Sequence, residues 1–193
     1  MKKFLNILLW IIGSLIVLSL LFMFVIGPIM LKQTKKHSPE KNITYNQEDL
    51  ELKVFYCSPS KKDRKIFGEL VPYGEVWRTG ANEASTFSTN KDLSIDGKTL
   101  AKGTYTLWTI PRETTWDLIF NSEMYEWGVN YTDQKPAREP KYDVLVTTVT
   151  VSKSLTTTES FTISFSDIGT ASVMTLAWDN VVVPVILEEI EKN

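Results

Sequence analysis

The stretch "GEVWRTGANEAS" (residues 74–85) carries the side chains best suited to chemistry: Trp77, Arg78, Asn82 and Glu83 lie within seven residues, beside two glycines. A guanidinium offers a planar fork of donors that fits carboxylate, sulfate or phosphate. In a functional interpretation, Trp77 forms the floor of a pocket and the other three residues form its polar lining. In a structural interpretation, Trp77 belongs to the core, Asn82 satisfies loop backbone groups, and Arg78 and Glu83 form a buried ion pair. Both interpretations remain open from the sequence.

A basic cluster, "KKDRK" (residues 61–65), precedes this stretch. Arg64 and Lys65 are candidates to join Arg78 in a site for an anionic ligand. The alternative is a solvated loop that has no binding role.

The residue types exclude several reaction classes. The only histidine is His37, which lies ahead of the strand-rich part of the chain, so a Ser-His-Asp or Cys-His arrangement is excluded there, as is a histidine-containing zinc site. Cys57 is the only cysteine, and we expect it to act as a small buried hydrophobe. No glycine-rich phosphate-binding motif occurs. The sequence therefore predicts no cofactor, no metal and no catalytic residue of these kinds.

Carboxylates remain as possible acid and base groups. Glycoside cleavage needs a pair of them about 5–10 Å apart across an open cleft. The candidates are Glu69, Glu75, Glu83, Asp117 and Glu123.

The N-terminal part of the chain predicts a membrane anchor. Residues 4–31 contain no charged side chain, and this run exceeds the roughly 20 apolar residues that a bilayer core requires. It is also longer than the apolar stretch of a cleavable signal peptide. We therefore expect a tip at residues 1–3, a transmembrane anchor at 4–31 and a juxtamembrane linker at 32–42. Lysines flank both ends of the apolar run, so charge alone leaves its orientation open.

Net charge argues against one class of partner. The whole chain has 21 basic and 23 acidic residues, and five of the lysines lie in the first 36 residues, which contain no acid. The remainder holds 16 basic and 23 acidic residues, a net charge of −7. An acidic domain of this kind has no general attraction for nucleic acid.

Beyond the linker, the pattern is that of β-strands. Segments rich in Val, Ile, Thr and aromatic residues alternate with period two, and turn pairs such as Asp96-Gly97 and Asp179-Asn180 separate them. Pro184 places the final strand at an edge or a bulge. Eight to ten short strands predict an all-β fold, an antiparallel β-sandwich with a jelly-roll-like or barrel-like variant as an option. We expect this domain to span residues 43–187, followed by a tail at 188–193.

The chain resembles a known bacterial family. The segments that carry the resemblance are "DRKIFGELVPYGEVWRTGANEAS", "GKTLAKGTYTLWTIP", "TWDLIFN", "YEWG" and "LAWDNVVVPV", which together cover about residues 40–187. They are similar to the hallmark of domain-of-unknown-function family 2911. The resemblance implies an all-β domain outside the cytoplasm and no established activity. Ser58 departs from the arginine that family members tend to have before the Pro-Ser pair.

The resulting expectation is a single-pass protein of the bacterial inner membrane that works by binding. Its domain would lie on the periplasmic side, tethered to the bilayer through residues 4–31, and would bind an envelope glycan, a peptide or a partner protein. The alternatives are a carboxylate-based hydrolase of a cell-envelope polymer and a structural component of the envelope.

Overall fold

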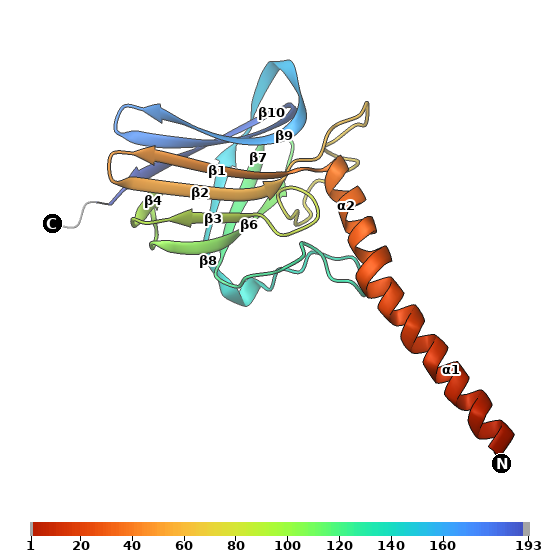
Figure 1. Cartoon of the computed structure of the whole chain (residues 1–193). Helices are drawn as coiled ribbons and strands as arrows, with labels where there is room; N and C mark the ends of the chain where they lie inside the picture. Colours follow the sequence, from red (N-terminus) through yellow and green to blue (C-terminus); the bar gives the residue numbers. More distant parts are fainter. Residues whose placement is uncertain (1, 191–193) are drawn as a thin grey trace. The chain divides into compact units, whose positions relative to one another are not determined.

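The computed structural model describes residues 2–190, and the chain divides into two compact units, Met1–His37 and Ser38–Asn193. The first unit is helical (Figure 1), with α1 at Lys2–Leu21, a π-helical turn at Phe22–Ile26 and α2 at Gly27–His37. The Gly27 N–H donates to the Phe22 carbonyl five residues earlier. Pro28 follows and has no N–H to donate, and such wider turns accommodate this loss inside a helix. The helical stretch Lys3–His37 is long and apolar enough to cross a membrane.

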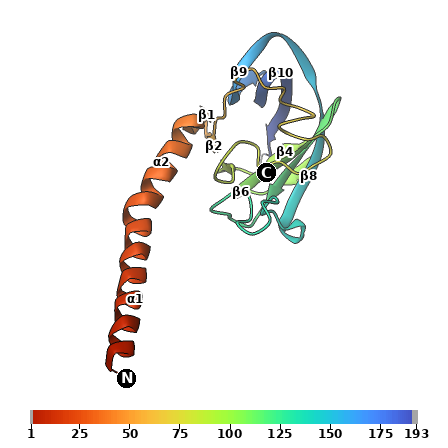
Figure 2. The same cartoon turned by 90° about the vertical axis from the view of Figure 1, so that its right-hand side faces the viewer.

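The second unit consists of two antiparallel sheets. The six-stranded sheet has the order β1-β2-β3-β6-β7-β8 and the four-stranded sheet has the order β5-β4-β10-β9. The strand bounds are β1 Glu40–Gln47, β2 Leu50–Cys57, β3 Thr86–Thr89, β4 Leu93–Ile95, β5 Lys98–Leu100, β6 Gly103–Pro111, β7 Thr115–Asn121, β8 Asp143–Thr150, β9 Ser152–Ile168 and β10 Ala171–Glu189. Figure 2 shows the first part of β9, in light blue, curving from the side of β8 towards β10. The prediction of an all-β antiparallel domain is confirmed.

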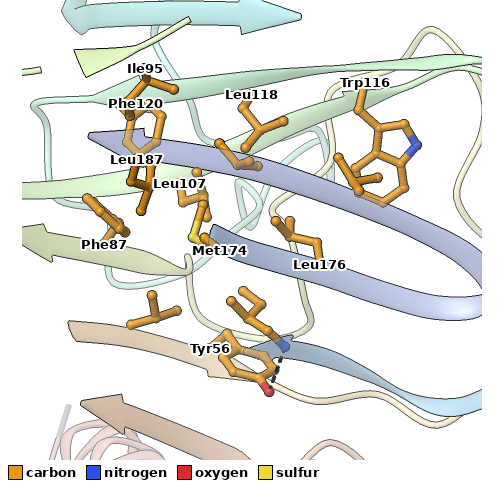
Figure 3. Close-up of a cluster of buried hydrophobic side chains, with 14 of the residues drawn as sticks. Tyr56, Phe87, Ile95, Leu107, Trp116, Leu118, Phe120, Met174, Leu176 and Leu187 are labelled. Carbon is orange, nitrogen blue, oxygen red and sulfur yellow. Dashed lines mark hydrogen bonds between the residues drawn. The ribbon is translucent and has the colours of Figure 1, made fainter. Parts of the chain in front are cut away.

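One hydrophobic core is shared by the two sheets. Its members include Leu52 of β2, Leu118 of β7, Ile163 of β9 and Leu176 of β10. Figure 3 shows part of this core, with side chains from both sheets pointing towards one another. The alternation of β2 accounts for its contribution, since Leu50, Leu52, Val54 and Tyr56 are all buried.

A smaller cluster covers the opposite face of the six-stranded sheet. Trp108 of β6 and Ile119 of β7 are fully buried on this face. Their side chains point to it because each is adjacent in its strand to a residue that faces the main core. Tyr125 and Ala137, from the segment of residues 122–139, pack against them. We call residues 122–139 the covering segment, since it shields this face of the sheet.

The Asp96-Gly97 turn forms as the sequence predicts. These two residues join β4 to β5, with φ of 52° and 71°. Positive φ at both central positions is the geometry of the hairpin turn that Asp-Gly favours.

The predicted turn at Asp179-Asn180 is wrong. The chain continues through these residues as one strand, β10, and the register with β9 shifts on both sides of Asp179, whose φ is 55°. A left-handed residue supports a bulge as well as a turn, so local composition does not separate the two. Pro184 follows the last residue paired with β9, Val182, and precedes the pairing with β4 at Glu188. It therefore lies where no ladder requires its missing N–H.

The expected linker and tail are more regular than the sequence suggests. Residues 32–37 continue α2, and β1 already begins at Glu40. At the other end, β10 extends to Glu189, whereas residues 191–193 lie outside the described residues.

Tyr56 joins the two sheets by a hydrogen bond. The backbone N–H of Ile163, on edge strand β9, donates to the Tyr56 hydroxyl at 3.1 Å across the core (Figure 3). Tyr56→Phe would leave this buried N–H without an acceptor, so we expect a loss of about 1–3 kcal/mol in the free energy of unfolding. Chemical denaturation of the full chain in detergent measures it.

Tyr131→Phe is the matched control, because Tyr131 is 79% exposed and should show no change. Equal stability of Tyr56→Phe and wild type would contradict the assigned role of the hydroxyl.

Candidate functional site

Trp77 is a core residue. Its ring stacks on Trp178 of β10 with centroids 5.9 Å apart and contacts Phe161 of β9 at 4.9 Å. Its indole N–H donates to the Gly80 carbonyl at 3.1 Å. The ring therefore ties the segment before β3 to the four-stranded sheet.

The backbone around Trp77 runs beside β6. The N–H of Trp77 donates to the Thr109 carbonyl at 2.7 Å, and the N–H of Thr109 donates back at 3.0 Å. Since side chains alternate along an extended segment, Val76 and Arg78 face away from the main core. Val76 packs against the Trp108 cluster, beneath the covering segment.

A tight turn follows at residues 79–82. Thr79 and Asn82 have φ of 56° and 59°, and both are buried. Gly80 is required by space as well as by its φ of 151°, because a side-chain carbon there would lie 2.8 Å from the Cys57 carbonyl. The Ala81 N–H donates to that same carbonyl at 3.2 Å. The turn is therefore fixed against the end of β2.

Arg78 lies against the covering segment without an ionic partner. Its side chain packs so closely on Gly128 that an added methyl group there would overlap its Cδ. Its Nε is buried and donates to no acceptor, and it forms no ion pair with any described residue. Burial lowers the pKa of Arg78, and the nearby Cys57 opposes this shift. The guanidinium nevertheless stays charged, as arginine does in proteins.

Asn82 also has a buried side-chain donor without a hydrogen bond. It is 7% exposed, and its Nδ2 makes no hydrogen bond of normal geometry, although it lies close enough to the Cys57 sulfur to lower the pKa of that thiol. Its backbone carbonyl accepts the Gly128 N–H at 2.9 Å. Among the described residues, the two buried side-chain polar atoms without a partner are Arg78 Nε and Asn82 Nδ2. Buried donors normally find partners, so the coincidence of both in one short loop marks it as unusual.

Glu83 contacts Cys57. The Cys57 thiol donates to Glu83 Oε2 at 3.0 Å. Burial raises the pKa of the Cys57 thiol to about 12, with Glu83 adding to the shift and Asn82 opposing it. The thiol is therefore protonated at neutral pH, in accord with its expected role as a buried, unreactive side chain.

A hollow of about 270 Å³ opens beside Arg78. Trp77 and Arg78 line it together with Glu75, and Gly128 and Gln134 of the covering segment contribute the facing wall. The other lining residues are apolar: Leu70, Val71, Pro72, Val76, Val129 and Pro136. Asn82 and Glu83 lie outside this lining, towards Cys57.

Arg64 and Lys65 also lie outside this lining. Arg64 donates from Nε to the Lys61 carbonyl at 2.9 Å and from Nη2 to the Ser60 carbonyl at 2.5 Å. Lys65 pairs with Glu69 at 3.2 Å on the exposed surface. Both cations thus interact with residues of their own loop.

Two of the candidate carboxylates, Asp117 and Glu75, lie in different surroundings. Asp117 pairs with Arg112 at 2.7 Å, and this contact holds the pKa of Asp117 below its ordinary value. A general acid needs the opposite shift. Glu75 lines the hollow beside Arg78.

Sequence reasoning missed Gly128 as the residue that faces Arg78. The motif "YEWG" contains it, but nothing in the sequence connects it to a residue 50 positions earlier. A glycine directly after a tryptophan, Trp127, is the one local signal, since glycine permits the close approach of another group.

The Cys57 assignment predicts an unreactive thiol. Iodoacetamide at pH 9 should leave Cys57 unmodified in the native chain and alkylate it after unfolding in urea, because the folded-state pKa is about 12 and the unfolded value is about 8.5. Because folding raises the pKa of the Cys57 thiol, the protonated thiol contributes to the free energy of unfolding. This contribution is complete below the unfolded-state pKa and is lost as the pH rises towards the folded-state pKa. Rapid native alkylation at pH 9, as measured by mass spectrometry, would contradict the assignment.

The packing of Arg78 on Gly128 predicts a coupled pair of substitutions. Gly128→Ala should lower the free energy of unfolding by about 1–3 kcal/mol, the usual effect of overpacking, because the new methyl group meets Arg78. Adding Arg78→Ala should recover part of the loss, since Cδ and Cγ are then gone and only the Cβ of residue 78, 2.7 Å from the new methyl group, still overlaps it. Denaturation of the two single variants and the double variant measures this coupling, and additive effects would show that the two residues do not touch.

Comparison with known proteins adds a family but no activity. A family model described as "Protein of unknown function (DUF2911)" matches residues 38–187. No curated protein and no solved structure matches the chain. The match covers all but the last two residues of the two sheets and the whole site described above, so the chain belongs to this uncharacterised family.

Proposed function

We propose that this protein is a membrane-tethered β-sandwich that works by binding, with its site at the hollow beside Arg78. The ligand would be a component of the bacterial envelope. Residues 4–31 would cross the inner membrane once, with the domain on the periplasmic side. The apolar helix and the shared core of two antiparallel sheets support this arrangement.

One observation carries the binding proposal. Burying a charged or polar donor without a partner costs free energy, and a fold gains nothing from keeping such groups. Arg78 Nε and Asn82 Nδ2 are both in that state, and Arg78 also borders a hollow. A bound ligand would supply the missing acceptor for the guanidinium.

The structural alternative requires a different arrangement. A scaffold role for Arg78 would need the buried ion pair with Glu83, but Arg78 forms no ion pair with a described residue and Glu83 accepts the Cys57 thiol. Trp77 is the residue of the motif that does serve the scaffold, through its packing in the core.

Arg78→Ala tests the proposal by separating stability from binding. We expect the free energy of unfolding to change by less than about 1 kcal/mol, because no partner is orphaned, whereas removing one member of a buried ion pair costs roughly 3–5 kcal/mol. Binding is measured by co-sedimentation of the full chain in detergent with insoluble cell-wall polymer, which contains glycan strands and peptides. The variant should lose most of the co-sedimentation.

Arg64→Ala is the matched control, since it removes an exposed guanidinium from the same domain. A loss of several kcal/mol in Arg78→Ala would support the scaffold role instead. Equal co-sedimentation of wild type and Arg78→Ala would reject this site.

A further inference from the structure

The hollow beside Arg78 is small and has a distinct chemical character. Its volume of about 270 Å³ lies below the roughly 300–1,000 Å³ of pockets that enclose a drug-sized ligand. It therefore admits the end of a molecule, not the length of a chain. Most of its lining is apolar, and Arg78 is the one cation among the described residues that line it.

We infer that this hollow binds the free carboxylate end of a peptide whose last residue is small and apolar, with Arg78 as the carboxylate partner. This inference rests on the proposed function, because it names the ligand class of the same site. The guanidinium presents two parallel donors, and a carboxylate accepts both. Capture of a terminal carboxylate is a known mode of peptide recognition.

The charges around the hollow favour a carboxylate over a phosphate. Glu75 also lines the hollow, so a dianion would face a negative side chain as well as Arg78. The chain beyond residue 36 carries a net charge of −7, which does not attract polyanions. A single negative charge beside Arg78 is therefore the form that this site tolerates best.

The position of Trp77 favours a peptide over a sugar acid. Aromatic rings that hold sugars present an open face, but the Trp77 ring is 8% exposed and is stacked on Trp178. The other walls are short aliphatic side chains and prolines, which suit a methyl-sized side chain. Gln134 adds a polar group at the same hollow: its Nε2 is turned towards the carbonyls of Asn130 and Tyr131, which leaves Oε1 to accept a peptide N–H.

Gly128 sets the position of the guanidinium. Because Arg78 packs directly on this glycine, Gly128→Ala must move the arginine side chain. The hollow would keep the positive charge of Arg78, but the guanidinium would lie in a different position. This substitution therefore tests whether placement of the fork, and not the positive charge alone, selects the ligand.

The experiment is calorimetric titration of the full chain in detergent with four probes: acetyl-Ala-Ala as the free acid, its C-terminal amide, glucuronic acid and inorganic phosphate. We expect the free acid to bind at least tenfold more tightly than the amide, glucuronic acid or phosphate. Arg78→Ala and Gly128→Ala should each weaken the free acid at least tenfold. Arg78→Lys should also weaken it, since lysine lacks the planar fork. Arg64→Ala should bind as wild type does.

Each other outcome overturns the inference. Equal binding of the acid and the amide would show that the carboxylate is not read. Tighter binding of glucuronic acid or phosphate would assign the site to a sugar acid or to phosphate. If no probe binds at millimolar concentration, the peptide carboxylate is rejected. In all three cases an Arg78-dependent co-sedimentation with cell-wall polymer would still uphold the proposed function, so the two failures are distinguishable.

Discussion

The packing of Trp77 between the sheets is the contact on which the rest of the site depends. Its ring meets Trp178 and Phe161 of the four-stranded sheet, while its backbone pairs with Thr109 of the six-stranded sheet. One residue thus joins both sheets by two kinds of interaction. Buried aromatic pairs of this kind add about 0.5–1.5 kcal/mol beyond their burial, and the backbone pairing fixes the direction of the chain.

Once Trp77 is fixed, the position of Arg78 follows from backbone geometry. An extended segment sends neighbouring side chains to opposite faces, so the residue after a core tryptophan must point away from that core. In most surface strands this direction leads to solvent. Here the covering segment lies over that face, held by Tyr125 and Ala137 against Trp108, and Arg78 packs on Gly128, so that part of its side chain is removed from water. The partial desolvation of Arg78, with its Nε buried, is thus a consequence of topology.

The sequence predicts the features of this protein that depend on local periodicity. Alternation along β2 and the Asp96-Gly97 pair specify a strand and a hairpin that the structure contains. The sequence also identifies residues 77–83 as the candidate functional loop. It does not predict the bulge at Asp179 or the contact between Arg78 and Gly128. Both depend on how distant segments meet, and residue types alone do not distinguish a bulge from a turn or a packed arginine from a paired one.

Two pairs of side chains at this loop differ in how their hydrogen bonds are made. Cys57 and Glu83 satisfy one another, and the raised pKa of the thiol keeps that hydrogen bond intact across the physiological range. Arg78 and Asn82 have no such arrangement. The hydrogen bond between Cys57 and Glu83 therefore fixes the geometry of the loop against β2. In the same loop, the hydrogen bonds of Arg78 and Asn82 are incomplete. A site built this way is preorganised, because the fixed loop already holds the open donor in place before a ligand arrives, and less ordering remains to be done on binding.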